Sequence, residues 1–152
     1  MFNRILAAVD RTELAEDVLE AAIAISKRFD SEVHVVHAIH SGVLASLLKS
    51  DDEDDGTVIG PDGPVREEED DEESLARRMR EHAEMHGTDI TIHTPEGAPG
   101  EEIVRVAEEV SADLIVLGAH EKNLVRRLLV GSVSGYVIEN SQVSTLIIKP
   151  AP

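Results

Sequence analysis

Cysteine is absent from the 152-residue sequence. Disulfides, thiolate metal sites and cysteine nucleophiles are therefore excluded. Long hydrophobic runs are missing too: the apolar stretch in MFNRILAAVDRTELAED is too short for the core of a signal peptide and far too short to span a bilayer. We therefore expect a cytoplasmic protein without a membrane segment. The length favours a single domain over residues 1–152 with one core.

Basic residues are also scarce. Lysine and arginine total 14 against 31 aspartates and glutamates, which gives a formal net charge of -17. A surface this acidic repels a phosphate backbone, so we expect no nucleic-acid partner. Only four of the cations are lysines, at Lys27, Lys49, Lys122 and Lys149. This composition favours a halophilic protein that stays soluble in concentrated salt, where screening shortens the range of self-repulsion to a few Å.

Strand-like and helix-like segments alternate along the whole chain, which is typical of a parallel sheet with helices on its faces. Short apolar or β-branched runs predict the strands, and apolar residues at helical spacing predict the helices. The predicted strands are Arg4–Val9, Val33–Ile39, Ile90–His93, Leu114–Leu117 and Val143–Ile148. The predicted helices follow Thr12, span Glu67–His86, follow Pro99, and span Ser132–Glu139.

Two helix ends and one loop carry local signals. Thr12 is a candidate N-cap, because acidic residues follow it in what would be the first helical turn. Gly87 is a candidate C-terminal stop. The acidic run Asp51–Asp55 and the glycines and prolines after it predict a mobile acidic loop over about residues 50–66. A short helix over Val43–Leu48 could lie at its edge.

Ligands of such sheets bind beyond the carboxyl ends of the strands, where the strand order reverses. Asp10 follows the first strand and could accept hydrogen bonds from a ribose, or could equally be a turn residue. Gly118 follows the fourth strand and would let the backbone approach a ligand. Gly131 and Ser132 open a helix, whose free N–H groups suit an anion, although an ordinary turn and N-cap have the same sequence.

The histidines favour structural roles over a metal site. His82 and His86 stand four apart on a predicted helix, but they lack the glutamate of the zinc-protease motif. His34, His37 and His40 alternate between the two faces of a strand and cannot converge on one ion. We therefore predict no metal site.

Catalytic motifs are not apparent in the sequence. It contains no nucleophile elbow, no Walker loop and no paired catalytic carboxylates. An enzyme with its own catalytic machinery is thus the least supported class, with slow ATP hydrolysis as its mildest form.

Three stretches resemble the universal stress protein family: VDRTELAEDVLEAAIAIS, VHVVHAI and ADLIVLGAHEKNLVRRLLVGSVSGYVIENSQVSTLIIKP. The acidic composition is similar to that of an archaeal halophile member. The resemblance implies an α/β fold, a Rossmann-like open sheet of five parallel strands with helices on both faces. It also implies ATP or AMP binding in one branch, with Mg²⁺ if the ligand is ATP, and a homodimer through the C-terminal strand.

Residue by residue, the resemblance places a nucleotide at the strand ends. The adenosine pocket would use Ala8, Asp10, Ala38, Leu117 and Gly118, and the phosphates would meet Gly131, Ser132 and Val133. The nucleotide-binding branch resembles the pattern glycine, two residues, glycine, nine residues, glycine and then serine or threonine. Gly118, Gly131 and Ser132 match this pattern in register.

The middle glycine of that pattern is replaced by Glu121. A carboxylate about 5 Å from a phosphate would repel it by roughly 3 kcal/mol at an effective dielectric constant of 20. That energy corresponds to about a hundredfold in affinity. Lys122, Arg126 and Arg127 could offset this repulsion or form a solvated basic patch. Two hypotheses stay open: a non-catalytic dimer that binds adenine nucleotide, and a protein-interaction module of the same family that has lost the nucleotide.

Overall fold

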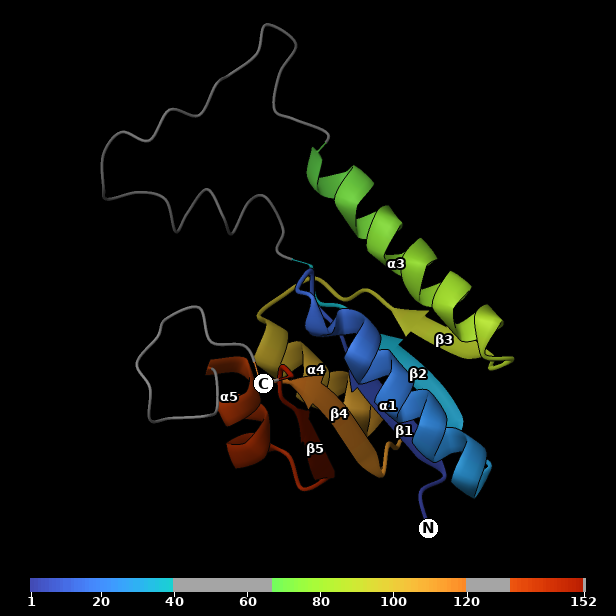
Figure 1. Ribbon diagram of the computed structural model, residues 1–152. Helices are drawn as coiled ribbons and strands as arrows, with labels where there is room; N and C mark the ends of the chain where they lie inside the picture. Colours follow the sequence, from blue (N-terminus) through green and yellow to red (C-terminus); the bar gives the residue numbers. More distant parts are fainter. Residues whose placement is uncertain (40–66, 120–131, 152) are drawn as a thin grey trace, which may run out of the picture.

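The computed structural model describes residues 1–39, 67–119 and 132–151, and all structural statements below concern these ranges. Five strands alternate with helices (Figure 1). The predicted acidic loop and the predicted helix over Val43–Leu48 lie outside the described residues. The strands are β1 Arg4–Ala8, β2 Glu32–Val36, β3 Ile90–His93, β4 Leu114–Gly118 and β5 Ser144–Ile148; the helices are α1 Leu14–Phe29, α3 Glu67–Met85, α4 Pro99–Glu109 and α5 Ser132–Asn140.

The sheet confirms the predicted α/β class. Its strand order is β3-β2-β1-β4-β5, and every neighbouring pair is parallel. The chain builds outward from β1 through β2 to β3 and then returns to the other side of β1 with β4. The order therefore reverses between β1 and β4, which is where such sheets bind ligands.

Apolar residues cover both faces of the sheet, as expected for parallel strands. On one face, α1 and α3 pack over the sheet (Figure 1), and Leu19, Ile23 and Met79 are almost completely buried there. On the other face, α4 and α5 bury Val106 and Val137 against the sheet. Ile5 contributes to the first of these cores and Leu6 to the second, because successive side chains of a strand point to opposite faces. No helix in the described ranges is long and apolar enough to cross a membrane.

Three helix ends test the local sequence signals. Gly87 has the positive φ of 64° that favours glycine at a helix end, and Pro99 is in the first turn of α4, both as predicted. The prediction of Thr12 as N-cap is wrong, because α1 begins at Leu14 and its N-cap position is Glu13. The Thr12 hydroxyl donates to Asp10 Oδ1, a charged acceptor, and its oxygen accepts the Leu14 N–H only at a long 3.4 Å.

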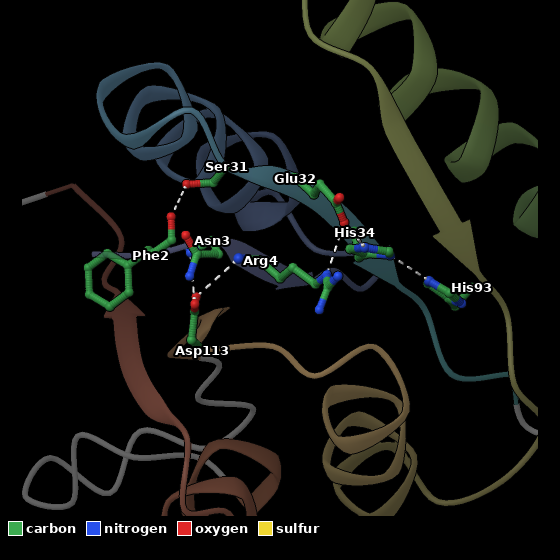
Figure 2. Close-up of polar contacts among 8 residues, drawn as sticks. All are labelled: Phe2, Asn3, Arg4, Ser31, Glu32, His34, His93 and Asp113. Atoms are coloured by element: carbon green, nitrogen blue, oxygen red, sulfur yellow. Dashed lines mark hydrogen bonds and ion pairs between the residues drawn. The ribbon is translucent and has the colours of Figure 1, made fainter.

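Asp113 joins the amino ends of the two central strands (Figure 2). Its carboxylate accepts hydrogen bonds from the backbone N–H of Asn3, at 2.7 Å, and of Arg4, at 3.2 Å. Nearby, the Ser31 hydroxyl donates to the Phe2 carbonyl at 2.5 Å. These bonds fix the amino edge of the sheet and leave its carboxyl edge for a ligand.

Candidate functional site

The carboxyl ends of β1 and β4 meet at the point where the strand order reverses. Ala8 and Leu117 are register partners there, and both side chains are buried. Gly118 ends β4 beside Ile148 of β5. Small and apolar residues therefore form the floor of this edge.

Asp10 lies two residues beyond β1 and is exposed. Its Oδ1 accepts the backbone N–H of Thr12 at 2.9 Å, together with the Thr12 hydroxyl. This is the turn that an aspartate makes with its own backbone. The turn was one of the two interpretations open from the sequence. The turn holds the carboxylate at the carboxyl edge of the sheet. A hydrogen bond from a ribose hydroxyl to this carboxylate stays a prediction.

Gly118 has a packing reason to be glycine that the sequence did not reveal. A Cβ at this position would lie 3.1 Å from Leu14 Cδ1 and 3.3 Å from Leu14 Cβ, at the start of α1. Both distances are tighter than ordinary van der Waals contact. The glycine thus lets the amino end of α1 approach the end of β4, and this approach also places the turn at Asp10 beside the fourth strand.

The amino end of α5 supplies the remaining predicted residues that the structure describes. Ser132 is the first residue of the helix and is exposed, and Val133 packs partly against the core. Free N–H groups at such an end attract anions. Gly131 and Glu121 lie outside the described residues, as do the basic side chains between them.

Ala38 follows β2, in a segment that still forms backbone hydrogen bonds with the residues just after β3. The N–H of Ile39 donates to the Pro95 carbonyl at 2.8 Å, and the N–H of Gly97 donates to the Ile39 carbonyl at 3.0 Å. The predicted strand Val33–Ile39 is thus too long at its end, because β2 stops at Val36 and only this pairing continues. Ala38 itself is half-buried.

His37 is a residue of this edge that the sequence assigned to no function. Its Nδ1 lies 3.2 Å from the Val9 carbonyl oxygen, which can only accept. Nδ1 must therefore carry the proton, and in the neutral ring Nε2 has a free lone pair. That Nε2 is buried and has no hydrogen-bond partner within the described structure. No sequence signal indicated this link between β1 and β2, because His37 was predicted to lie within the strand Val33–Ile39.

The other histidines of the described ranges form two pairs. His82 and His86 lie on α3 with ring centroids 4.8 Å apart, and His34 of β2 contacts His93 of β3. His34 and His37 have different partners and do not converge. Within residues 1–39, 67–119 and 132–151, no three histidines, aspartates or glutamates lie close enough to hold a metal ion.

The site that results has one carboxylate, one serine hydroxyl, a helix amino end and a floor of small apolar residues. Such an edge suits recognition of a ligand that combines an apolar ring, hydroxyl groups and an anionic group. Ala8, Leu117 and Gly118 end two adjacent strands at this edge. Asp10 follows β1, and Ser132 begins α5.

The model of the universal stress protein family matches residues 1–149. Universal stress protein MJ0531 of Methanocaldococcus jannaschii is 30% identical over 149 residues, which cover 98% of this chain and 83% of that protein.

Two solved structures are similar in fold. The universal stress protein from Archaeoglobus fulgidus in complex with dAMP has a TM-score of 0.68 and 22% identity, and the match covers 98% of both chains. A universal stress protein in complex with cAMP has a TM-score of 0.67 and 21% identity, with 97% of this chain and 96% of that chain covered. At these identities the likeness establishes the fold, and the nucleotides belong to those two proteins.

Proposed function

The chain belongs to the universal stress protein family, and from this premise we propose that it is a non-catalytic stress-response protein that binds an adenine nucleotide, ATP or AMP. The observation that carries the proposal is the meeting of Ala8 and Leu117 at the carboxyl ends of β1 and β4, where the strand order reverses. The complexes of two relatives with dAMP and cAMP support the same ligand class.

Each part of the edge has a role in this proposal. Ala8, Ala38 and Leu117 form the apolar surface and the backbone that receive the adenine ring. Asp10 accepts a hydrogen bond from a ribose hydroxyl while its turn with Thr12 holds it in place. The amino end of α5 with the Ser132 hydroxyl binds the phosphates, accompanied by Gly131 and Val133. Mg²⁺ accompanies the ligand when this is ATP.

The test is calorimetric titration of the purified protein with adenosine, AMP and ATP in molar KCl. Asp10→Asn should weaken all three ligands about equally, because the ribose is common to them. Ser132→Ala should weaken AMP and ATP and leave adenosine unchanged. Asp89→Asn is the matched control, since it removes one negative charge from an exposed residue that precedes β3 at the opposite edge. Equal effects of Asp10→Asn and Asp89→Asn would contradict the assignment of the ribose contact.

Glu121 supports a second candidate, a protein-interaction module of the same family that does not bind nucleotide. This residue lies outside the described residues, so the argument rests on its place in the sequence. Glu121→Gln removes the charge and keeps the size, and Glu121→Gly removes both. Repulsion predicts that both variants strengthen ATP binding more than adenosine binding, by up to about a hundredfold. If the natural protein does not bind ATP in the titration and Glu121→Gly does, the second candidate is favoured.

We also propose that two copies pair through β5. This strand forms one edge of the sheet, and Leu146 is 36% exposed on it. An apolar edge strand is normally covered by a partner, because its unpaired N–H and C=O groups favour addition of another strand. Leu146→Glu should convert the dimer to a monomer in light-scattering measurements, whereas Glu84→Gln on the exposed surface of α3 should not. If the Leu146→Glu variant is still a dimer, the interface does not lie on β5.

A further inference from the structure

A histidine pair joins the edge strand β3 to its neighbour β2. His34 Nδ1 lies 3.0 Å from His93 Nε2, which is hydrogen-bond distance. Figure 2 shows the two rings pointing toward one another from the adjacent strands. Both rings are half-buried. Their register partners, Leu6 for His34 and Val36 for His93, belong to the core on the α4 side.

The contact persists only in certain protonation states. When both rings are neutral, one contacting nitrogen donates its proton and the other accepts it. One added proton is tolerated, since an imidazolium still donates to a neutral ring. A second added proton puts hydrogen atoms on both contacting nitrogens, and the hydrogen bond is replaced by repulsion between two cations.

A carboxylate and a guanidinium lie beside the His34 ring. Glu32 Oε2 lies 3.7 Å from His34 Nε2, on the far side of the His34 ring, and it also pairs with Arg4 Nε at 3.0 Å. The hydrogen bond and charge of Arg4 lower the pKa of Glu32, so the carboxylate stays ionised in mild acid. His34 therefore has a negative partner for its second N–H.

The surroundings of His93 disfavour its protonated form. Its burial lowers its pKa, and the charge of His34 adds to this effect, while Glu109 of α4 opposes it. The other helices that pack near these strands, α1 and α3, lie on the opposite face of the sheet. Among the described residues, Arg4, Glu32 and Glu109 are the charged groups found beside the pair, on β1, β2 and α4.

We propose that His34 and His93 form an acid-sensitive clasp that holds β3 against β2 near neutral pH and releases this edge of the sheet when both rings become protonated. The release extends toward the carboxyl edge. The His93 carbonyl accepts the His37 N–H at 3.0 Å, and Ile39 bonds to Pro95 just beyond. Loosening of β3 therefore also loosens the segment that contains Ala38.

The experiment combines histidine NMR titration with amide hydrogen exchange from pH 7.5 to 4.5 without nucleotide. Its outcome is thus independent of the proposed ligand. Protection factors correct for the intrinsic pH dependence of exchange, and those of β3 are divided by those of β1. We expect His93 to titrate below the ordinary histidine pKa of about 6.5, because burial lowers its pKa. The ratio of β3 protection to β1 protection should fall as the pH is lowered. If opening of β3 takes up one proton, the fall is up to about tenfold per pH unit.

Variants separate the clasp from general acid sensitivity. His93→Gln keeps a neutral amide that can donate or accept, so its β3 ratio should stay constant over the same range. His86→Gln, on α3, should behave as the natural protein does. A β3 ratio that does not change with pH in the natural protein would overturn the proposal. A fall of equal size in the natural protein and in His93→Gln would do so too. If His93→Gln does not fold, the same comparison is made with His34→Gln.

Discussion

Gly100 allows α4 and α5 to approach closely, and its replacement by alanine should destabilise the protein. Gly100 is buried in the first turn of α4. A Cβ there would lie 2.8 Å from Tyr136 Cδ1, 2.9 Å from Cγ and 3.0 Å from Cβ. Real Cβ atoms almost never approach other atoms this closely, and two of these three are near the stem of the tyrosine rather than at its flexible end. The helices must therefore separate to admit one methyl group.

Two effects of opposite sign determine the size of the change. Alanine is favoured over glycine in a helix interior by up to about 1 kcal/mol. Overpacking of a dense contact costs roughly 1–3 kcal/mol. The steric effect should win, because the contacts lie within 3.0 Å, and we expect a net loss of about 1–2 kcal/mol in the free energy of unfolding. The corresponding shift of the urea midpoint is on the order of 0.5–1 M for a protein of this size.

The assay is urea denaturation at fixed salt for a double-mutant cycle. Tyr136→Ala removes Cγ and Cδ1 and leaves only the contact at 3.0 Å. In that background, Gly100→Ala should be neutral or stabilising, so the sign of its effect reverses and the coupling energy is about 1–3 kcal/mol. The reasoning is refuted if Gly100→Ala stabilises the natural protein, or if its effect is the same in both backgrounds.

Three further predictions concern charge. Arg78→Gln should cost about 0.5 kcal/mol at neutral pH, since its 2.9 Å ion pair with Glu16 is largely exposed. Arg78 lowers the pKa of Glu16, so this contribution is present above the ordinary carboxyl pKa of 4.5 and disappears as the pH falls through the lowered value. Urea denaturation of both proteins at several pH values measures it. Asp113→Ala should cost about 1–2 kcal/mol, because the N–H groups of Asn3 and Arg4 lose a charged acceptor, and Asp113→Asn should cost less in the same assay. The free energy of unfolding should rise from about 0.1 M to 2 M KCl, because salt screens a net charge of -17, and an unchanged value would argue against a halophilic protein.

Hydrophobic patterns predicted most of the fold. β3 spans Ile90–His93 as its β-branched residues indicated, and α3 ends within one residue of the predicted end. Hydrophobic periodicity is a property of many side chains, so one unexpected contact does not change the predicted helix or strand. The parallel order followed from the alternation of strands and helices, because parallel neighbours need a crossover connection.

Single contacts were harder to predict from the sequence. Thr12 has the residue type and position of an N-cap, but a nearby carboxylate, Asp10, takes its hydroxyl. Gly118 was a candidate for close approach of a ligand, and the atom that approaches it is in Leu14. The pairing of His34 with His93 joins two strands 59 positions apart. Such contacts depend on which elements become neighbours, and one sequence does not specify that at the level of atoms.

The central position of β1 has a consequence for the protein during its synthesis. β1 is made first, yet β4, one of its two neighbours, begins at Leu114, and the residues joined by the Asp113–Asn3 bond are 110 positions apart. At about 5–20 residues per second, a ribosome needs roughly 5–20 s to make that intervening chain. For that time the nascent β1 has an open edge of apolar residues. Chaperones that bind extended apolar segments should therefore associate with the nascent chain until β4 emerges.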